Sequence, residues 1–268
     1  VIGGDGSLRG ALALSDEIER RGAEIAVVGV PKTIDNDIRW IERSFGFATA
    51  VEEATRVCYA AHAEARGAMD GIGLVKLMGR ESGFIAAHAT LASSDVNFCL
   101  VPEVPFDLDG PGGFLDVIDR RLADRHHAVV VVAEGAGQDL VADEHAGERD
   151  PSGNRRLGDI GVHLQRRLVE HLGDRGTVKY LDPSYSIRSL RANAVDAEFC
   201  LALGQHAVHA ALAGYTASMI GYWNQRFTLV PIPMAVAERR HLDPDGDEWQ
   251  RVLQTTGQPR SMRVTPAG

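Results

Sequence analysis

Closely spaced cysteines are missing from this sequence. It contains three cysteines, Cys58, Cys99 and Cys200, which are widely separated and form no CxxC motif. Such spacing does not build a disulfide framework. We therefore expect three buried thiols in a protein of a reducing compartment, the cytoplasm.

Long apolar segments and an excess of positive charge are missing as well. The longest strongly apolar run, residues 128–133, is far shorter than the ~20 residues that cross a bilayer. The formal net charge is −9, whereas binding to a nucleic-acid backbone needs clustered lysine and arginine. We therefore expect neither a membrane nor a nucleic acid as partner.

Short apolar runs alternate with amphipathic segments along the 268 residues, of which 44% are hydrophobic. We expect strands at residues 25–28, 72–77, 96–101, 129–132, 177–181 and 218–222. We expect helices at residues 8–21, 44–65, 84–92, 113–125, 160–172, 192–213 and 245–254. Ser44 is the expected N-cap of the second helix. The alternation predicts an α/β fold with a doubly wound parallel sheet.

Two further segments have ambiguous patterns. Residues 135–158 are rich in polar residues and glycine without periodicity, which is typical of a mobile loop over a site and equally of ordinary disorder. His206 and His209 are spaced to present two metal ligands, but no third ligand has a matching position. Core or surface histidines are the simpler interpretation. Residues 231–233 are expected to form a turn.

The central motif is VGVPKTIDND, residues 28–37. The apolar run 25–28 ends in glycine and proline, which indicates a buried strand that leads into a loop. The loop then carries Lys32, Thr33, Asp35 and Asp37. Ligands of open α/β sheets bind beyond the carboxyl ends of strands, which suggests a site here. An acidic, solvated turn would have the same composition.

A second motif, GGDGS at residues 3–7, precedes a helical pattern. Glycines at a strand-to-helix turn let the backbone approach a phosphate, and the helix N-terminus supplies free N–H groups. Asp5 would be well placed there if Mg²⁺ accompanies the phosphates. Taken alone, the motif is weak evidence.

Together with later motifs, these two stretches resemble the phosphofructokinase family. The later motifs, in that family's order, are KLMGRESGFIA (76–86), PEVPF (102–106), EGAGQ (134–138) and KYLDPSYSIR (179–188). The sequences of these motifs are most similar to those of the ATP-dependent plant and trypanosomatid group, which resembles pyrophosphate-dependent enzymes. The resemblance extends from residue 1 to about residue 259. It implies doubly wound parallel sheets in two Rossmann-like domains.

The resemblance also implies a division of the chain. Residues 1–66 with 189–236 would form the ATP-binding domain, and residues 67–188 with 237–268 the fructose-6-phosphate-binding domain. The family normally has a further glycine-rich loop and a basic residue ahead of GGDG, and neither is in this sequence. We therefore expect an N-terminal truncation.

Site residues follow from the resemblance, motif by motif. For the phosphoryl donor they are Gly4, Asp5, Gly6, Ser7 and Lys32, with Asp5 as the Mg²⁺ ligand and Asp37 as a second carboxylate near the ion. For the sugar phosphate they are Thr33, Ile34, Asp35, Met78, Gly79, Arg80, Glu103, Tyr185, Ser186, Ile187 and Arg188. Asp35 would be the catalytic base. Without the family, Met78 is equally a core residue, Arg80 a surface cation and Glu103 part of a rigid turn between prolines.

The implied reaction is glycolytic: transfer of the γ-phosphate of ATP to the 1-hydroxyl of fructose 6-phosphate by an allosteric homo-oligomer, a dimer or tetramer. Gly71 stands where bacterial enzymes carry an arginine that reaches into a neighbouring subunit, so the sharing of the sugar site stays open. A non-catalytic subunit or fragment is one alternative. A pyrophosphate-dependent enzyme is another, because Lys32 matches both donor classes while Gly6 matches ATP users.

Overall fold

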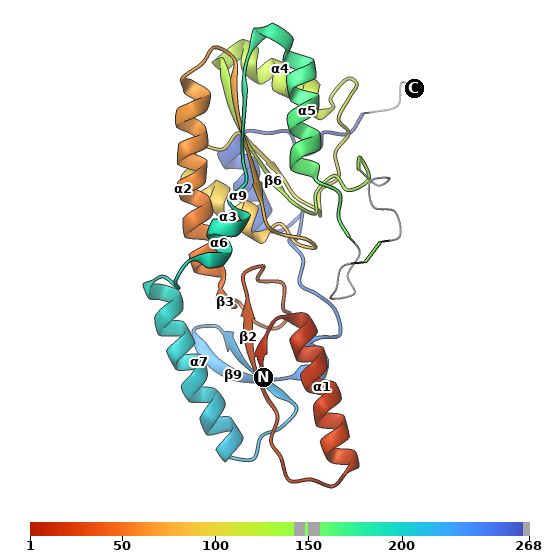
Figure 1. Cartoon of the computed structure of the whole chain (residues 1–268), viewed down its shortest axis with the longest axis vertical. Helices are drawn as coiled ribbons and strands as arrows, with labels where there is room; N and C mark the ends of the chain where they lie inside the picture. The colour runs from red at the N-terminus through yellow and green to blue at the C-terminus, as the bar shows by residue number, and fades with distance from the viewer. Residues whose placement is uncertain (142–147, 150–155, 265–268) are drawn as a thin grey trace. The chain divides into compact units, whose positions relative to one another are not determined.

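The computed structural model describes residues 1–141, 148–149 and 156–264. The chain divides into two compact units, Val1–Ala50 with Leu190–Arg240 and Val51–Ser189 with His241–Gly268 (Figure 1). The first division falls inside helix α2 (Phe47–Arg66). None of the helices in the described ranges combines the length and apolarity of a bilayer-crossing segment.

The first unit contains a five-stranded sheet of order β1-β2-β8-β9, with β3 also paired to β2. Its strands are β1 (Ile2–Gly3), β2 (Val28–Thr33), β3 (Phe45–Gly46), β8 (Ser218–Trp223) and β9 (Arg226–Pro231). Its helices are α1 (Asp5–Arg20), α7 (Ala194–Leu212) and α8 (Ile232–Ala235), besides the first turn of α2. β9 is antiparallel to β8, and the remaining pairs are parallel.

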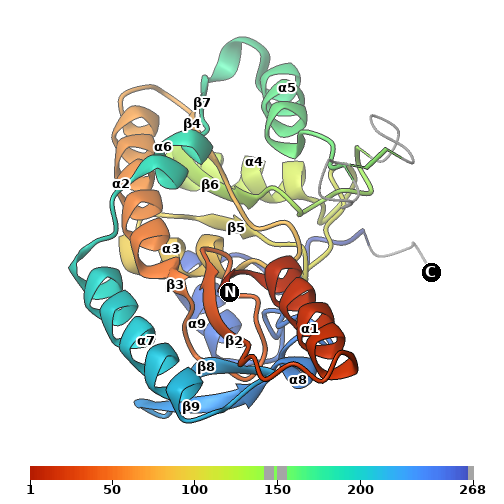
Figure 2. The ribbon, with the colours of Figure 1, turned by 60° about the horizontal axis from the view of Figure 1, so that its bottom comes forward.

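Two apolar clusters cover opposite faces of this sheet. On one face Leu8 and Ala11 of α1 pack with Met219. On the other, Phe199 and Leu203 of α7 pack with strand residues of β2 and β8. Figure 2 shows α1 and α7 on the two sides of the sheet. This arrangement is the doubly wound architecture that the alternating pattern predicts.

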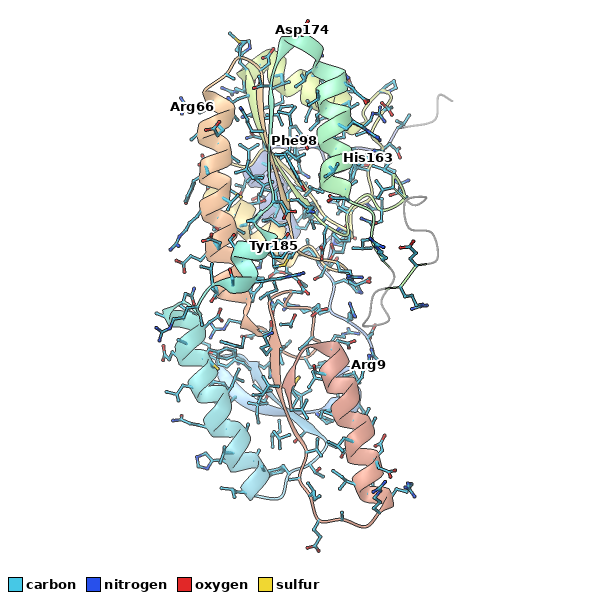
Figure 3. All side chains as sticks on the ribbon, viewed as in Figure 1. Arg9, Arg66, Phe98, His163, Asp174 and Tyr185 are labelled. Carbon is cyan, nitrogen blue, oxygen red and sulfur yellow. The ribbon has the colours of Figure 1, made fainter. Side chains whose placement is uncertain are left out.

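The second unit contains a parallel four-stranded sheet of order β5-β6-β4-β7. Its strands are β4 (Gly71–Leu77), β5 (Phe98–Leu100), β6 (His127–Ala133) and β7 (Val178–Leu181). Its helices are the rest of α2, α3 (Phe84–Ser93), α4 (Phe114–Arg125), α5 (Ile160–Leu172), α6 (Ser184–Ser189) and α9 (Asp247–Thr256), with a 3₁₀ turn at Gly173–Arg175. The middle of β6 is fully buried, as expected for a strand covered on both faces. Phe98 (Figure 3) meets Phe114 edge-on, with ring centroids 5.7 Å apart.

The fold class and most predicted elements are confirmed, but the central strand lies further along the chain than predicted. The apolar run predicted a strand at 25–28 and a loop from Gly29, whereas β2 begins at Val28 and ends at Thr33. Pro31 does not end it, because β1 and β3 supply parallel partners up to Thr33. Lys32 and Thr33 are therefore strand residues.

Ser44 is not the N-cap of α2, which begins at Phe47. Its hydroxyl donates to the carbonyl of Thr33 at 2.7 Å, and its N–H donates to Oδ1 of Asn36 at 2.9 Å. Ser44 thus stabilises the loop of the central motif.

Several elements, among them β3, were not predicted. A hairpin joins β8 to the antiparallel edge strand β9 through Asn224 and Gln225, both with positive φ. This geometry suits a two-residue turn although neither residue is glycine. Helix α8 replaces the turn expected at residues 231–233, and α6 forms in the segment after β7, where no helix was expected.

The expectation of three buried thiols is wrong for one of them. Cys200 is exposed on α7, while Cys58 and Cys99 are buried. Burial raises the pKa of each of these two thiols to about 12. Within the irregular segment predicted at 135–158, residues 142–147 and 150–155 lie outside the described residues.

Candidate functional site

The two glycine and aspartate motifs meet at the carboxyl edge of the sheet in the first unit. β1 and β2 are parallel neighbours, with Gly3 opposite Pro31. A Cβ on Gly4 would lie 3.4 Å from the Cβ of Thr33, so the backbone of GGDGS passes directly beside the end of β2. The structure therefore brings the predicted phosphate loop and the predicted catalytic loop together.

Helix α1 begins within the first motif. Gly4 is its N-cap and makes no side-chain capping bond. The first-turn N–H groups of Asp5, Gly6 and Ser7 precede the first intrahelical donor, that of Leu8. A helix end of this kind is suited to an anionic ligand because of its N–H groups and its positive dipole end.

Gly6 faces open space. A Cβ built on it meets no heavy atom within 4 Å, whereas one on Gly3 would overlap the side chain of Ser7. The protein itself therefore tolerates a side chain at position 6. Any requirement for glycine there must come from a ligand.

Asp35, the predicted base, lies two residues after the end of β2. Its N–H donates to Oγ1 of Thr33 at 3.2 Å, which places both residues in one short turn. Thr33, Ile34 and Asp35 are partly exposed, and Lys32 is exposed. Side chains here can reach a ligand without a change in the strand.

Asp5 and Asp37 share one guanidinium. The terminal nitrogens of Arg239 lie 3.6 Å from Oδ2 of Asp5 and 3.8 Å from Oδ2 of Asp37. Arg9, on the first turns of α1, also contacts Asp5, at 3.0 Å. Arg239 was not identified from the sequence, because no motif surrounds it.

Motif residues of the second unit likewise follow the carboxyl ends of parallel strands. Met78, Gly79 and Arg80 follow β4, while Glu134 follows β6. Gly79 has a φ of +133°, and its carbonyl accepts the N–H of Gly135 at 3.1 Å. A side chain at Gly135 would overlap the carbonyl of Arg80, so the close approach requires glycine. Both segments are thus held side by side.

The segment after β7 also contacts the residues that follow β4. Nε of Arg188 donates to Sδ of the buried Met78 at 2.9 Å. Tyr185 is 89% exposed and projects from α6 (Figure 3), so its phenol is available to a ligand. The hydroxyl of Ser186 donates to the carbonyl of Pro183, and Ile187 is buried. A contact of Ile187 with a substrate would therefore involve its backbone.

Glu103 makes three main-chain contacts. Its carboxylate accepts the N–H of Gly83 at 3.0 and 3.1 Å and the N–H of Leu242 at 2.9 Å. Burial raises the pKa of this carboxyl, although the N–H groups oppose the shift. These bonds connect α3, the segment after β5 and the chain ahead of α9, which favours a structural role. Glu134 is a second, partly exposed carboxyl-bearing residue at this edge, and its N–H donates to the carbonyl of Leu77, next to Met78. The end of a buried strand followed by glycine could have identified it.

A charged cluster supports the start of α6. Nζ of Lys76 lies 2.9 Å from Asp182 and 3.2 Å from Asp159. Burial alone would lower the pKa of Lys76, but the hydrogen bond to Asp182 and the nearby negative charges raise it. Asp182 in turn accepts the N–H of Ser184 at 3.0 Å. Lys76 thereby holds the segment that carries Tyr185 and Arg188.

Metal-binding clusters of three or more histidine, cysteine or acidic side chains are not found among the described residues. Mg²⁺ does not need one, since it is usually held by one or two carboxylates together with substrate phosphates. Asp5 and Asp37 have the right chemistry, and both lie within ion-pair range of Arg239. The donor set fits Mg²⁺ that arrives with a phosphate ligand.

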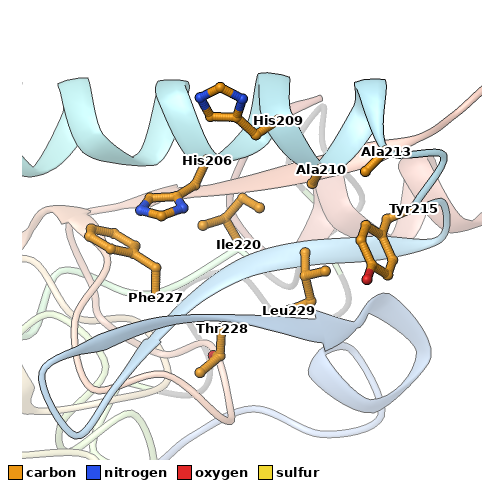
Figure 4. A pocket seen from close by; sticks show the side chains of 9 residues that line it. All are labelled: His206, His209, Ala210, Ala213, Tyr215, Ile220, Phe227, Thr228 and Leu229. Carbon is orange, nitrogen blue, oxygen red and sulfur yellow. The ribbon is translucent and has the colours of Figure 1, made fainter.

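A separate groove of about 450 Å³ lies on the first unit, between α7 and the β8–β9 hairpin (Figure 4). His206 stacks on Phe227 with ring centroids 4.3 Å apart, and His209 also lines the groove. No third potential metal ligand joins the two histidines in the described residues. The groove contains none of the predicted site residues.

Comparison with known proteins gives consistent matches. The family model for phosphofructokinase matches residues 1–211. The ATP-dependent 6-phosphofructokinase of Borreliella burgdorferi is 50% identical over 271 residues, which cover 98% of this chain and 60% of that protein. The ATP-dependent 6-phosphofructokinase 1 of Arabidopsis thaliana is 49% identical, with 98% of this chain and 57% of that protein covered.

Among solved structures, a pyrophosphate-dependent phosphofructokinase from Marinobacter aquaeolei superposes with a TM-score of 0.73 and 25% identity. The match covers all of this chain and 69% of that one. The chain thus spans about 60% of the length of the curated relatives that it matches.

Proposed function

This chain belongs to the phosphofructokinase family, and we propose that the protein containing it transfers the γ-phosphate of ATP to the 1-hydroxyl of fructose 6-phosphate. One observation carries the proposal. Parallel pairing of β1 with β2 sets the N-terminus of α1 beside Thr33 and Asp35. A phosphate-binding helix end and a candidate base are then neighbours at one sheet edge, as phosphoryl transfer requires.

Asp35 is the proposed proton acceptor for the sugar hydroxyl. Thr33 orients the turn through its bond to the N–H of Asp35. Lys32 and the N–H groups of Gly4, Asp5, Gly6 and Ser7 would contact the donor's phosphates and offset the negative charge on the transferred group. These groups lie on β2, shortly after it or at the N-terminus of α1, and these elements form without a ligand.

Mg²⁺ is the proposed cofactor, held by Asp5 and, directly or through water, by Asp37. When bound it neutralises phosphate charge and orients the transferring group. The carboxylates are 12% and 9% exposed, so little water competes with such a ligand.

The sugar 6-phosphate is proposed to bind at the carboxyl edge of the second sheet. Arg80 and Arg188 provide guanidinium groups, which match phosphate geometry. Met78, Gly79 and the segment Tyr185–Arg188 would contact the sugar, with Glu134 rather than Glu103 as the carboxylate for its hydroxyls. The first unit would thus be the ATP-binding domain and the second the fructose-6-phosphate-binding domain. We further propose that the protein is a homo-oligomer and is located in the cytoplasm.

Pyrophosphate is the alternative donor, which the Marinobacter structure suggests and which Lys32 does not exclude. Gly6 favours ATP, because its missing side chain leaves room for the α-phosphate and nucleoside. The test compares kcat/KM for ATP and pyrophosphate in the complete wild-type protein and in Gly6→Asp. We expect ATP to be preferred by the wild type, and Gly6→Asp to fold normally while losing ATP turnover. Better wild-type turnover with pyrophosphate, or no loss in Gly6→Asp, would refute the donor assignment.

A further inference from the structure

We propose that Arg239 is an internal counter-ion that keeps Asp5 and Asp37 from holding a divalent cation until the phosphoryl donor brings one. The inference rests on the proposed function of these two carboxylates. It assigns a positioning and specificity role to a residue outside every recognised motif.

The backbone holds Arg239 beside the catalytic loop. Arg239 forms an isolated antiparallel bridge with Ile38, and the N–H of Arg240 donates to the carbonyl of Asp37 at 2.8 Å. Ile38 is buried in the core of the first unit. The position of Arg239 is therefore determined by main-chain pairing and not by its side chain alone.

Its guanidinium is shared between two motifs. One terminal nitrogen approaches Asp5 of GGDGS at 3.6 Å, and the other approaches Asp37 of TIDND at 3.8 Å. Both distances exceed a hydrogen bond but lie within ion-pair range. With 28% of its side chain exposed, Arg239 interacts with two carboxylates in surroundings that screen charge less than water does.

The charge balance explains the proposed effect. Asp5 and Asp37 carry two negative charges, and the partly buried Arg239 offsets one of them, whereas solvent screens the pairing of the more exposed Arg9 with Asp5. The two carboxylates therefore attract a divalent cation weakly. A cation that arrives with a polyphosphate brings negative charge as well, and Arg239 can then pair with the phosphates. The arrangement favours the metal–donor complex over the free metal.

Arg9 offers a matched control. It contacts the same oxygen of Asp5, Oδ2, but its side chain is 53% exposed and its ion pair is with Asp5, not with Asp37. An exposed i,i+4 pair of this kind contributes little. Replacing Arg9 or Arg239 removes the same charge, but only the second substitution removes the shared contact.

The experiment is a titration of the complete protein with Mn²⁺, without nucleotide, followed by electron paramagnetic resonance. Arg239→Met is expected to bind Mn²⁺ roughly ten- to a hundredfold more tightly than wild type. Arg9→Met and the charge-conserving Arg239→Lys should stay within about threefold. Adding Asp37→Asn to Arg239→Met should abolish the gain.

Unchanged binding in Arg239→Met would overturn the proposal, as would an equal gain in Arg9→Met or a gain that survives Asp37→Asn. If Arg239→Met does not fold, Arg239→Gln takes its place, and Arg239→Lys still reports whether charge is sufficient. Failure of the ATP reaction itself would appear in the Gly6→Asp assays and would leave the Mn²⁺ result unaffected. The two proposals can therefore fail separately.

Discussion

Nε of Arg188 donates a hydrogen bond to Sδ of Met78, across 2.9 Å and 110 positions of sequence. The two residues lie in separate motifs, one directly after β4 and the other in α6. A thioether is a weak acceptor, so the contact orients the guanidinium without occupying its remaining donors. Arg188 is thus placed in advance for an anion.

The contact leads to the first prediction. Arg80→Ala or Arg188→Ala should raise KM for fructose 6-phosphate roughly ten- to a hundredfold, because each loses a charge-assisted phosphate contact of about 1.5–3 kcal/mol. KM for ATP should hardly change. Arg66→Ala, which removes an exposed arginine at the end of α2, serves as the control and should shift KM by less than about threefold. Steady-state kinetics of the complete protein tests this prediction. An equal rise in KM for both substrates would indicate a structural role for the arginine instead.

A second prediction concerns Asp35. Asp35→Ser should lower kcat by roughly 100- to 10,000-fold, because a general base is lost, with little change in affinity for fructose 6-phosphate. Asp16→Asn, an exposed site on α1, is the matched control. A kcat within about threefold of wild type, a difference of only ~0.6 kcal/mol, is incompatible with Asp35 as the base.

The third prediction is a pH dependence of stability from the Lys76–Asp182 pair. Burial would raise the pKa of Asp182, but hydrogen bonds from Ser184 and Lys76 lower it. A carboxyl with a depressed folded-state pKa stabilises the fold above its unfolded value near 4, and this contribution is lost as pH falls further. The raised pKa of Lys76 keeps its contribution through neutral pH up to strongly basic conditions.

Lys76→Met should therefore lower the urea midpoint at pH 7 by an amount that shrinks as the pH falls below about 4. It should also raise KM for fructose 6-phosphate, because α6 loses its support. Lys179→Met, an exposed lysine on β7, is the control. A pH-independent difference between Lys76→Met and wild type would contradict the ion-pair explanation.

A fourth prediction concerns the buried Asp196 in the first turn of α7. Its Oδ2 accepts the N–H of Thr49 at 2.7 Å and the Thr49 hydroxyl at 2.6 Å. Asp196→Ala leaves both donors unpaired in the interior, so it should destabilise the first unit by about 3 kcal/mol. Glu198→Ala, which changes an exposed residue two positions further along α7, should alter stability by less than ~0.5 kcal/mol. Urea unfolding curves test both, and equal effects would refute the role of the buried bonds.

Local patterns predicted most of the helices and strands because their signals are short in range. Residues 160–172 form a helix with the predicted boundaries, since apolar spacing and the Asp159 cap agree there. The predictions were wrong where hydrogen-bond partners from elsewhere in the chain determine the local structure. β2 extends past Pro31 because β1 and β3 pair with it, and Ser44 bonds to Thr33 and Asn36 instead of capping α2.

The sequence by itself determined the motif residues, because glycines, carboxylates and arginines at fixed spacing carry that information locally. Only the tertiary structure decided which of them lie together. It assigned the oxygens of Glu103 to main-chain N–H groups, brought Glu134 beside Met78 and placed Arg239 between Asp5 and Asp37. Contacts of this kind join residues up to 234 positions apart, as Asp5 and Arg239 are. They depend on sheet order and register, which spacing along the chain does not encode.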